Sequence, residues 1–409
     1  MERLPVLTLA ALFVGYACSY FHRADLATLA PLLTKDAALA PLHQALPDIA
    51  SLGMLVYAFG KVVGGLFAER LGGRRLFVLA LLLASVAEFA AMQVDTPAAF
   101  AACRVLGMAV LGCAWPALGH VVSTVTPIAR LATVMALLSQ SYLLGDAAVR
   151  AVLAAVVANG GGKSTVLGTS AIGLFVGAAV VGVALFFARP RPSRPANDHG
   201  RTTASRAPSN GNPRAMLWGL TAMNFALALV RESLSLWTPF LLVSASGLAV
   251  DKAIAASALL PLTSCVGALV AGPLADRGER WLLVVTFVPA LLGAVCLACL
   301  AATGTSAPGL MIAGIALASA VLAMPMTLAS GVLPLRVAAT GGAKRLGIVD
   351  GAGSLGAVLA GGPLARIQNE WGAFGTFSTL ALVALAAAAF AVVVHRVSGN
   401  GTPLAPLPR

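Results

Sequence analysis

The chain has 409 residues, of which 59% are hydrophobic and only 10% are charged, and its formal net charge is +12. Soluble globular proteins have about 45–50% apolar and about 25% charged residues, so this composition excludes an ordinary soluble enzyme and a disordered chain. A membrane-spanning helix needs about 20 apolar residues, so the hydrophobic content is enough for about twelve spans. The basic residues lie in short loops between apolar runs, which indicates a membrane protein rather than a nucleic-acid-binding one.

Apolar stretches of spanning length recur along the chain, and their lengths and Ala, Leu and Val content predict helices rather than barrel strands. In chain order, the predicted helices cover residues 6–33, 47–69, 75–94, 97–124, 129–158, 165–188, 214–244, 251–275, 281–302, 308–333, 340–369 and 371–397. The first is interpreted as a span and not a removed signal peptide. The six cysteines fall in apolar segments, so we expect no disulfide, no metal site and no cofactor.

One segment interrupts this pattern. Residues 189–214 contain six Arg and one Asp among many Pro, Ser, Asn and Gly residues, which predicts a flexible linker. The linker divides the chain into an N-terminal six-helix bundle (1–188) and a C-terminal six-helix bundle (214–409), with 189–213 between them. The predicted fold is therefore an all-α integral membrane protein.

The two halves are related in sequence. Three pairs of similar positions are separated by 207 to 209 residues: Arg23 and Arg231, Glu69 and Asp276, and Pro116 and Pro325. The agreement of the three offsets predicts an internal duplication, which is a recurring architecture of transporters.

The distribution of basic residues predicts the orientation. If the linker is cytoplasmic, eighteen Lys and Arg residues lie on that side and three on the other. This asymmetry predicts that both termini are cytoplasmic in a multi-pass protein of the inner (plasma) membrane. The expected partners are the lipid bilayer and a small anion, with no nucleic acid, and we expect a monomer.

A short signature follows the second and eighth predicted helices. It has the form G-x-x-x-[DE]-R, and it reads Gly65 to Glu69-Arg70 in the first half and Gly272 to Asp276-Arg277 in the second. This double signature resembles that of the major facilitator superfamily, and the resemblance covers nearly the whole chain. It implies twelve transmembrane helices in two pseudo-symmetric six-helix bundles. It also implies that a set of charged residues governs gating: Glu69, Arg70, Arg74, Asp276 and Arg277.

A narrower resemblance covers four segments. These are GYACSYFHRADLATLAP (15–31), YAFGKVVGG (57–65), the Trp115-Pro116 pair and LVRESLSLWTPFL (229–241). Together they resemble the organophosphate:phosphate antiporters, which include the glycerol-3-phosphate and hexose-phosphate carriers. The resemblance implies that two arginines grip the phosphate and that three further side chains line the central pathway. The arginines are Arg23 and Arg231, and the pathway residues are Tyr16, Tyr20 and Lys61.

The residues themselves support a site at the two arginines. An arginine in the middle of a spanning helix costs about 2.5–3.5 kcal/mol by insertion scales, so it must face a wet cavity or a partner. Tyr16, Tyr20 and Arg23 are spaced four and three residues apart and share one helix face. The seventh predicted helix has a similar polar stripe, formed by Asn224, Arg231, Ser235 and Thr238.

We expect both arginines to lack a partner close in sequence. Asp25, two residues from Arg23, points elsewhere, and Glu232 cannot share the helix face of Arg231. Two cations at equivalent depths of duplicated halves repel each other unless an anion lies between them, and guanidinium groups match phosphate oxygens bidentately. The alternative is that each arginine caps carbonyl groups or pairs with a carboxylate from another helix.

Three helices depart from the antiporter pattern. The fifth has Tyr142 where a histidine is expected, and it adds Asp146 and Arg150 at the i,i+4 spacing of an ion pair. The fourth adds Arg104, which resembles an arginine of proton-coupled members of the superfamily. His22 we interpret as packed or facing lipid headgroups.

Further carboxylates lie within predicted spans, including Glu88 and Asp350. Each is a candidate proton acceptor, and each is equally a candidate partner of Lys61, Arg104 or Arg366. The departures from the antiporter pattern therefore leave the counter-transported species open.

The resulting prediction is a secondary transporter that exchanges a small organic anion, a phosphate ester, for inorganic phosphate by alternating access. Arg23 and Arg231 form the clamp, Tyr16, Tyr20 and Tyr142 supply hydroxyl groups, and Lys61 adds positive potential. One alternative is a proton-coupled organic-anion symporter. Its candidate coupling residues are Asp25, Glu88, Arg104, Asp146 and Asp350. A second alternative is a sugar-phosphate sensor that does not transport.

Overall fold

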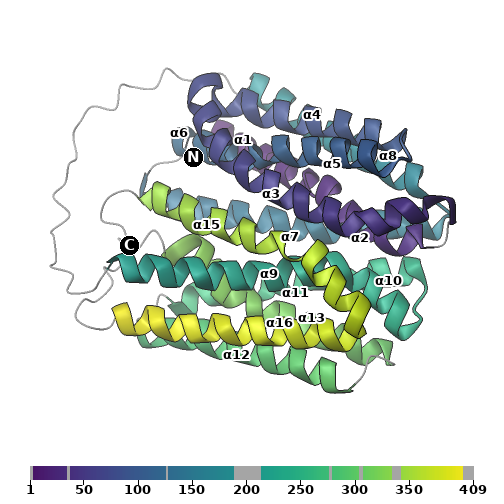
Figure 1. Cartoon of the computed structure of the whole chain (residues 1–409). Helices are drawn as coiled ribbons and strands as arrows, with labels where there is room; N and C mark the ends of the chain where they lie inside the picture. Colours follow the sequence, from purple (N-terminus) through teal and green to yellow (C-terminus); the bar gives the residue numbers. More distant parts are fainter. Residues whose placement is uncertain are drawn as a thin grey trace.

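The computed structural model describes residues 3–34, 37–125, 128–187, 213–275, 279–303, 307–333 and 342–398. Within these ranges the protein is a bundle of long helices that run along one common direction (Figure 1). Ten of the described helical stretches are long and apolar enough to cross a membrane. The predicted all-helical membrane fold is confirmed.

The described part of the first half forms nine helical elements. They are α1 (Arg3–Cys18), α2 (Phe21–Leu33), the 3-10 turn η1 (Ala37–Leu39), α3 (Ala40–Leu71), α4 (Gly73–Met92), α5 (Pro97–Gly112), α6 (Ala114–Val125), α7 (Ile128–Ala158) and α8 (Lys163–Phe187). The predicted helix 6–33 breaks at residues 19–20, where the Ser19 hydroxyl donates to the Tyr16 carbonyl at 2.6 Å. This hydroxyl competes for a carbonyl of the helix backbone.

The second half repeats this pattern with its own interruptions. It contains α9 (Pro213–Ser246), α10 (Val250–Ser257), α11 (Leu259–Ala275), α12 (Glu279–Thr303), α13 (Pro308–Thr327), the π-helical turn η2 (Leu328–Val332), α15 (Gly342–Val358) and α16 (Gly362–Ser398). The last two predicted spans meet inside α16 at Gly372, whose φ of 61° and ψ of −154° break the helical path. Only glycine adopts this conformation at low cost.

The side chains on the outside of the bundle are apolar. Large hydrophobic residues such as Phe89, Ile172, Phe186 and Leu382 are more than half exposed, whereas Arg104 and Arg150 are only 1% exposed. This arrangement inverts the usual pattern of a soluble protein and suits a surface in contact with lipid.

Each half packs around its own hydrophobic core. Leu12, Phe77, Phe100, Leu118 and Leu153 belong to the core of the first half. The core of the second half includes Leu220, Leu241, Leu297, Ile315 and Phe377. Between the halves, α2 packs on α9, α3 packs on α15 and α16, and α7 packs on α10 and α11. Side chains from these helices therefore line the interface.

The two halves are in close contact at the end of the bundle where α10 and the start of α16 lie, on the right of Figure 1. The Ser51 hydroxyl of α3 donates to the Val358 carbonyl at 2.6 Å, and the Gly362 amide donates to the same hydroxyl at 2.8 Å. Ala154 of α7 packs against Val250 and Ile254 of α10. This end, opposite the start of α1 and the end of α16, is therefore closed by direct contacts.

Candidate substrate-binding site between the two bundles

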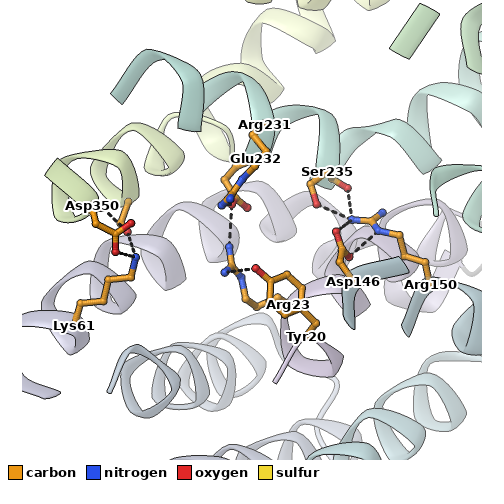
Figure 2. A network of polar contacts seen from close by, with 10 residues as sticks. Tyr20, Arg23, Lys61, Asp146, Arg150, Arg231, Glu232, Ser235 and Asp350 are labelled. Atoms are coloured by element: carbon orange, nitrogen blue, oxygen red, sulfur yellow. Dashed lines mark hydrogen bonds and ion pairs between the residues drawn. The ribbon is translucent and has the colours of Figure 1, made fainter. Parts of the chain in front are cut away.

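The two arginines singled out by the sequence meet at the interface. Arg23 lies on α2, directly after the break in the first span, and Arg231 lies near the middle of α9. Arg23 donates one hydrogen bond to the Tyr20 hydroxyl at 3.0 Å and another to Oε1 of Glu232 at 2.9 Å. Arg231 donates to the same Oε1 atom. One carboxylate oxygen therefore joins an arginine from each half (Figure 2).

This geometry corrects the prediction that both arginines lack a partner. Adjacent residues on a helix point about 100° apart, and this separation led to the expectation that Glu232 faces away from Arg231. Both side chains are long enough to bend into the interface, where opposite charges attract strongly because little water screens them. Asp25 does point away from Arg23, as expected, and it bonds to Arg104.

The three charged groups leave the site with one excess positive charge. The two guanidinium groups contribute two positive charges and the Glu232 carboxylate one negative charge. The side chain of Arg231 is 33% exposed, against 11% for Arg23 and 16% for Glu232. The most accessible group at this point of the interface is therefore a cation.

All four tyrosines of the chain lie around these arginines. The guanidinium carbon of Arg23 lies 4.9 Å from the centre of the Tyr20 ring and 5.1 Å from that of Tyr57. The guanidinium carbon of Arg231 lies 5.6 Å from the centre of the Tyr142 ring. These distances are typical of cation–π contacts. Tyr16 packs edge-on against Tyr20.

Tyr57 was not predicted as a site residue, although it opens the YAFGK segment that carries the family resemblance. Its ring contacts both Arg23 and Lys61, at 5.1 and 5.0 Å. The spacing of four residues between Tyr57 and Lys61 was the signal in the sequence, since it places both side chains on one helix face.

Two small cavities of about 50 Å³ flank the Arg23–Glu232 pair. Each has room for a few water molecules. The first includes Tyr142, Arg231 and the serines Ser264 and Ser319 in its wall. His22, Arg104 and Met108 line the second. Sequence reasoning did not identify the two serines, because single hydroxyl residues in apolar helices carry no recognisable pattern.

A second charge pair connects the halves. Lys61 of α3 donates to Oδ2 of Asp350 on α15 at 2.8 Å and to the Ser354 hydroxyl at 2.9 Å. Lys61 is therefore matched by its own carboxylate, one of the alternatives considered for it, and it does not add uncompensated positive potential to the arginine site.

A third polar group lies on the other side of the arginines (Figure 2). Asp146 and Arg150 of α7 form the expected i,i+4 ion pair, with Nε and Oδ1 2.8 Å apart. Arg150 also donates to the Ser257 hydroxyl at 3.0 Å and to the Ser235 hydroxyl at 2.6 Å. Ser235, predicted to bind substrate, is thus bonded across the interface to Arg150.

Asn224, another member of the predicted α9 stripe, lies away from the arginine site. Asn224 is buried and donates to the Val349 carbonyl of α15 at 2.8 Å. It fixes α15 on α9 and does not contact either arginine of the site.

A fully buried charged cluster lies behind Arg23 within the first half. Arg104 of α5 donates to both carboxylate oxygens of Asp25 at 2.8 Å, and it also contacts Glu88 of α4. His22 contacts Glu88 through Nδ1, and its Nε2 lies 3.3 Å from the Arg104 carbonyl. His22, Asp25 and Glu88 are residue types that bind metals, and their ligand atoms lie within 4.8 Å of one another. The Arg104 guanidinium already supplies the cation among them.

The predicted gating residues are only partly within the described ranges. Arg70 is exposed at the α3–α4 junction, and Arg74 is half-buried. The side chain of Glu69, together with Asp276 and Arg277, lies outside the described residues. The gating role of this group stays a prediction.

Comparison with known proteins agrees with this architecture. Residues 12–340 match the family described as the Major Facilitator Superfamily. The chain belongs to the major facilitator superfamily. It is therefore a multi-pass membrane protein and a transporter rather than an enzyme. The match extends across both halves of the protein and thus includes the arginine site.

Solved structures of other transporters share the fold. A bacterial homologue of the human lysosomal transporter Spinster, inward-facing and unoccupied, is 15% identical with a TM-score of 0.65, over 97% of each chain. A D-xylose-proton symporter is 14% identical with a TM-score of 0.72, over 95% of this chain and 96% of the other. A POT family transporter in complex with a thioalcohol-conjugated peptide is 12% identical with a TM-score of 0.72, over 94% and 95%. These likenesses concern the fold alone.

Proposed function

We propose that the protein carries a small organic anion across the membrane by alternating access, with Arg23 and Arg231 binding the negative group. One observation carries this proposal: an arginine from each half reaches the same carboxylate oxygen at the interface. An anion bound in this way is held by both bundles at once. Such a ligand favours the closing of the two halves around it, which is the step a rocking transporter needs.

The charge of the site supports an anionic ligand. The Arg23–Glu232–Arg231 group carries one excess positive charge, whereas Lys61 and Arg150 are each matched by a carboxylate. An uncompensated charge in a membrane protein interior is costly. An anion that neutralises the site therefore lowers the free energy of the closed, water-excluded state relative to the empty one.

Exchange of a phosphate ester for inorganic phosphate is the more specific form of this proposal. It rests on the resemblance of residues 15–31, 57–65 and 229–241 to the organophosphate:phosphate antiporters. The bidentate fit of guanidinium to phosphate supports it. The carboxylate of Glu232 weighs against it, because the two arginines do not present two uncompensated charges.

Transport by reconstituted protein tests the proposal. Arg23→Lys and Arg231→Lys keep the charge but remove the planar fork of donors, so each should reduce uptake of the anion at least tenfold with normal expression. Anions for the assay come from a thermal-shift screen of phosphate, phosphate esters, phosphonates and carboxylates. Arg75→Lys, at an exposed position on α4, is the matched control. Undiminished uptake by either interface variant would refute the anion clamp.

Proton-coupled symport is the second candidate, and the buried cluster supports it. The Arg104 carbonyl can only accept, so the hydrogen bond from His22 requires a hydrogen on Nε2. A proton between Nδ1 and Glu88 would make their contact a hydrogen bond, whereas without it Nδ1 can accept from the Arg104 guanidinium 3.2 Å away. With this proton the cluster of Arg104, Asp25, His22 and Glu88 is neutral. Without it the cluster has one buried negative charge, which is unfavourable.

An imposed pH gradient distinguishes the two candidates. If the His22–Glu88 proton moves with the substrate, an inward proton gradient should accelerate wild-type uptake and a protonophore should abolish the effect. Glu88→Gln should then lose the response to the gradient but retain exchange of anion across the membrane. If neither the proton gradient nor the protonophore changes wild-type uptake, proton-coupled symport is refuted.

A further inference from the structure

Glu232 occupies the position in which the proposed function requires the negative group of a substrate. Its Oε1 atom accepts from Arg23 of the first half at 2.9 Å and from Arg231 of its own helix. The bond to Arg231 stays within α9, whereas the bond to Arg23 crosses between the halves. The cross-half bond is therefore the one that a bound anion would replace.

We propose that Glu232 is an internal substitute for the substrate anion, which allows the empty carrier to close and return without a second anion. The inference rests on the proposed function. With Glu232 in place, the empty site has an ion pair across the interface, as the loaded site would. Two unneutralised arginines would repel each other and hold the empty halves apart.

The surroundings give the carboxylate room to leave Arg23. Two cavities at the interface include Arg23 and Glu232 in their walls, one on the side of Tyr142 and Arg231 and the other on the side of Met108. The Glu232 side chain is 16% exposed and thus is not locked by packing. An incoming anion can reach the site first through Arg231, the most exposed of the three groups.

The charge count also selects the class of substrate. With Glu232 retained on Arg231, a singly charged anion brings the site from one excess positive charge to zero. A dianion, such as a fully ionised phosphate ester, would leave one excess negative charge in the closed interface. Since buried charge without a partner is unfavourable, the geometry favours a monoanion, and a carboxylate matches the group that it replaces.

Chemical rescue tests this inference without knowledge of the substrate. Glu232→Ala leaves a carboxylate-sized space between the two guanidinium groups. In chloride buffer the purified variant should lose several degrees of melting temperature, and millimolar acetate should restore most of this loss. Asp350→Ala removes the same charge from the neighbouring inter-half pair, which has a single cation, and acetate should not restore its stability. Wild type should not respond to acetate at these concentrations.

A separate experiment measures whether the carrier without bound anion can close and reorient. Spin labels at Asp48 and Glu370, both exposed at the closed end, report the distance between the halves in a cysteine-free background. Wild type without anion should populate both closed and open distances. Glu232→Ala should shift to the open distance and recover the closed one with acetate, whereas Glu232→Asp, which keeps the charge, should resemble wild type.

Different results would overturn the role of Glu232 and the anion-carrier function. Equal acetate responses of Glu232→Ala and Asp350→Ala, or unchanged distance populations in Glu232→Ala, would overturn the role of Glu232 alone. Rescue by phosphate but not by acetate would refute the preference for a carboxylate monoanion. The anion-carrier function itself fails only if the arginine variants transport normally, which is a different assay.

Discussion

Arg104 is only 1% exposed, as is Arg150, and it bonds to groups from α2 and α4. Among the described residues, its guanidinium is the only Lys or Arg group in contact with Asp25 and Glu88. Arg104→Met should therefore leave two buried carboxylates facing each other without the Arg104 cation between them. We expect a loss of about 3–5 kcal/mol in stability, typical of a buried ion pair deprived of one partner.

Thermal or denaturant unfolding in detergent measures this loss. Arg75→Met, on the exposed face of α4, is the control and should change stability little. If Arg104→Met is as stable as Arg75→Met, Arg104 does not stabilise the buried cluster.

Tyr57 offers a second prediction at the residue scale. Its ring contacts the cations of Arg23 and Lys61, whose hydrogen bonds go to the Tyr20 hydroxyl and Glu232 and to Asp350 and the Ser354 hydroxyl. Tyr57→Phe should therefore retain anion affinity, whereas Tyr57→Ala should weaken it by about 0.5–2 kcal/mol, the range of a cation–π contact. Equal losses in the two variants, measured by equilibrium binding of the anion found in the screen, would show that the ring face is not the important feature.

At the scale of elements, the closed end depends on the close approach of α3 to the α15–α16 junction. A Cβ atom at Gly361 would lie 2.4 Å from both the Pro47 carbonyl oxygen and the Ser51 hydroxyl. Gly361→Val should therefore prevent the contact and bias the protein toward the state in which this end is open. Gly351→Ala is the control, because a Cβ atom there has no neighbour within 4 Å.

The accessibility of Ala50→Cys, a buried position of α3 beside Ala360 and Gly361, to a thiol reagent measures this bias. The reactivity should increase in the Gly361→Val background and stay unchanged with Gly351→Ala. If both backgrounds react alike, the contact at Gly361 does not control the closing of this end.

At the scale of the whole molecule, the described start of α1 and end of α16 lie at the same end of the bundle (Figure 1). The excess of Arg and Lys on this side predicts that it faces the cytoplasm. Asn159, in the exposed turn between α7 and α8, lies at the opposite end from Arg75. A membrane-impermeant thiol reagent added to intact cells should thus label Asn159→Cys and spare Arg75→Cys. The reverse pattern would invert the topology.

Much of the fold follows from the sequence because lipid exposure imposes long apolar helices, and these are visible as runs of residues. The positions at which the helices break were not predicted from the sequence. The first span divides at residues 19–20, where the Ser19 hydroxyl bonds to the Tyr16 carbonyl, and α16 turns at Gly372 because of its backbone conformation. Both depend on local geometry rather than on hydropathy.

The polar residues inside the bundle show most clearly what the sequence could predict and what it could not. The sequence alone determined which charges lie within the membrane, the i,i+4 pair of Asp146 and Arg150, and one arginine at equivalent positions of each half. Only the tertiary structure decided that Glu232 joins the two arginines and that Lys61 finds Asp350 289 residues away. The physical reason is that helix periodicity sets the direction of the Cβ atom, whereas the partner of a long charged side chain depends on which helices fold against it.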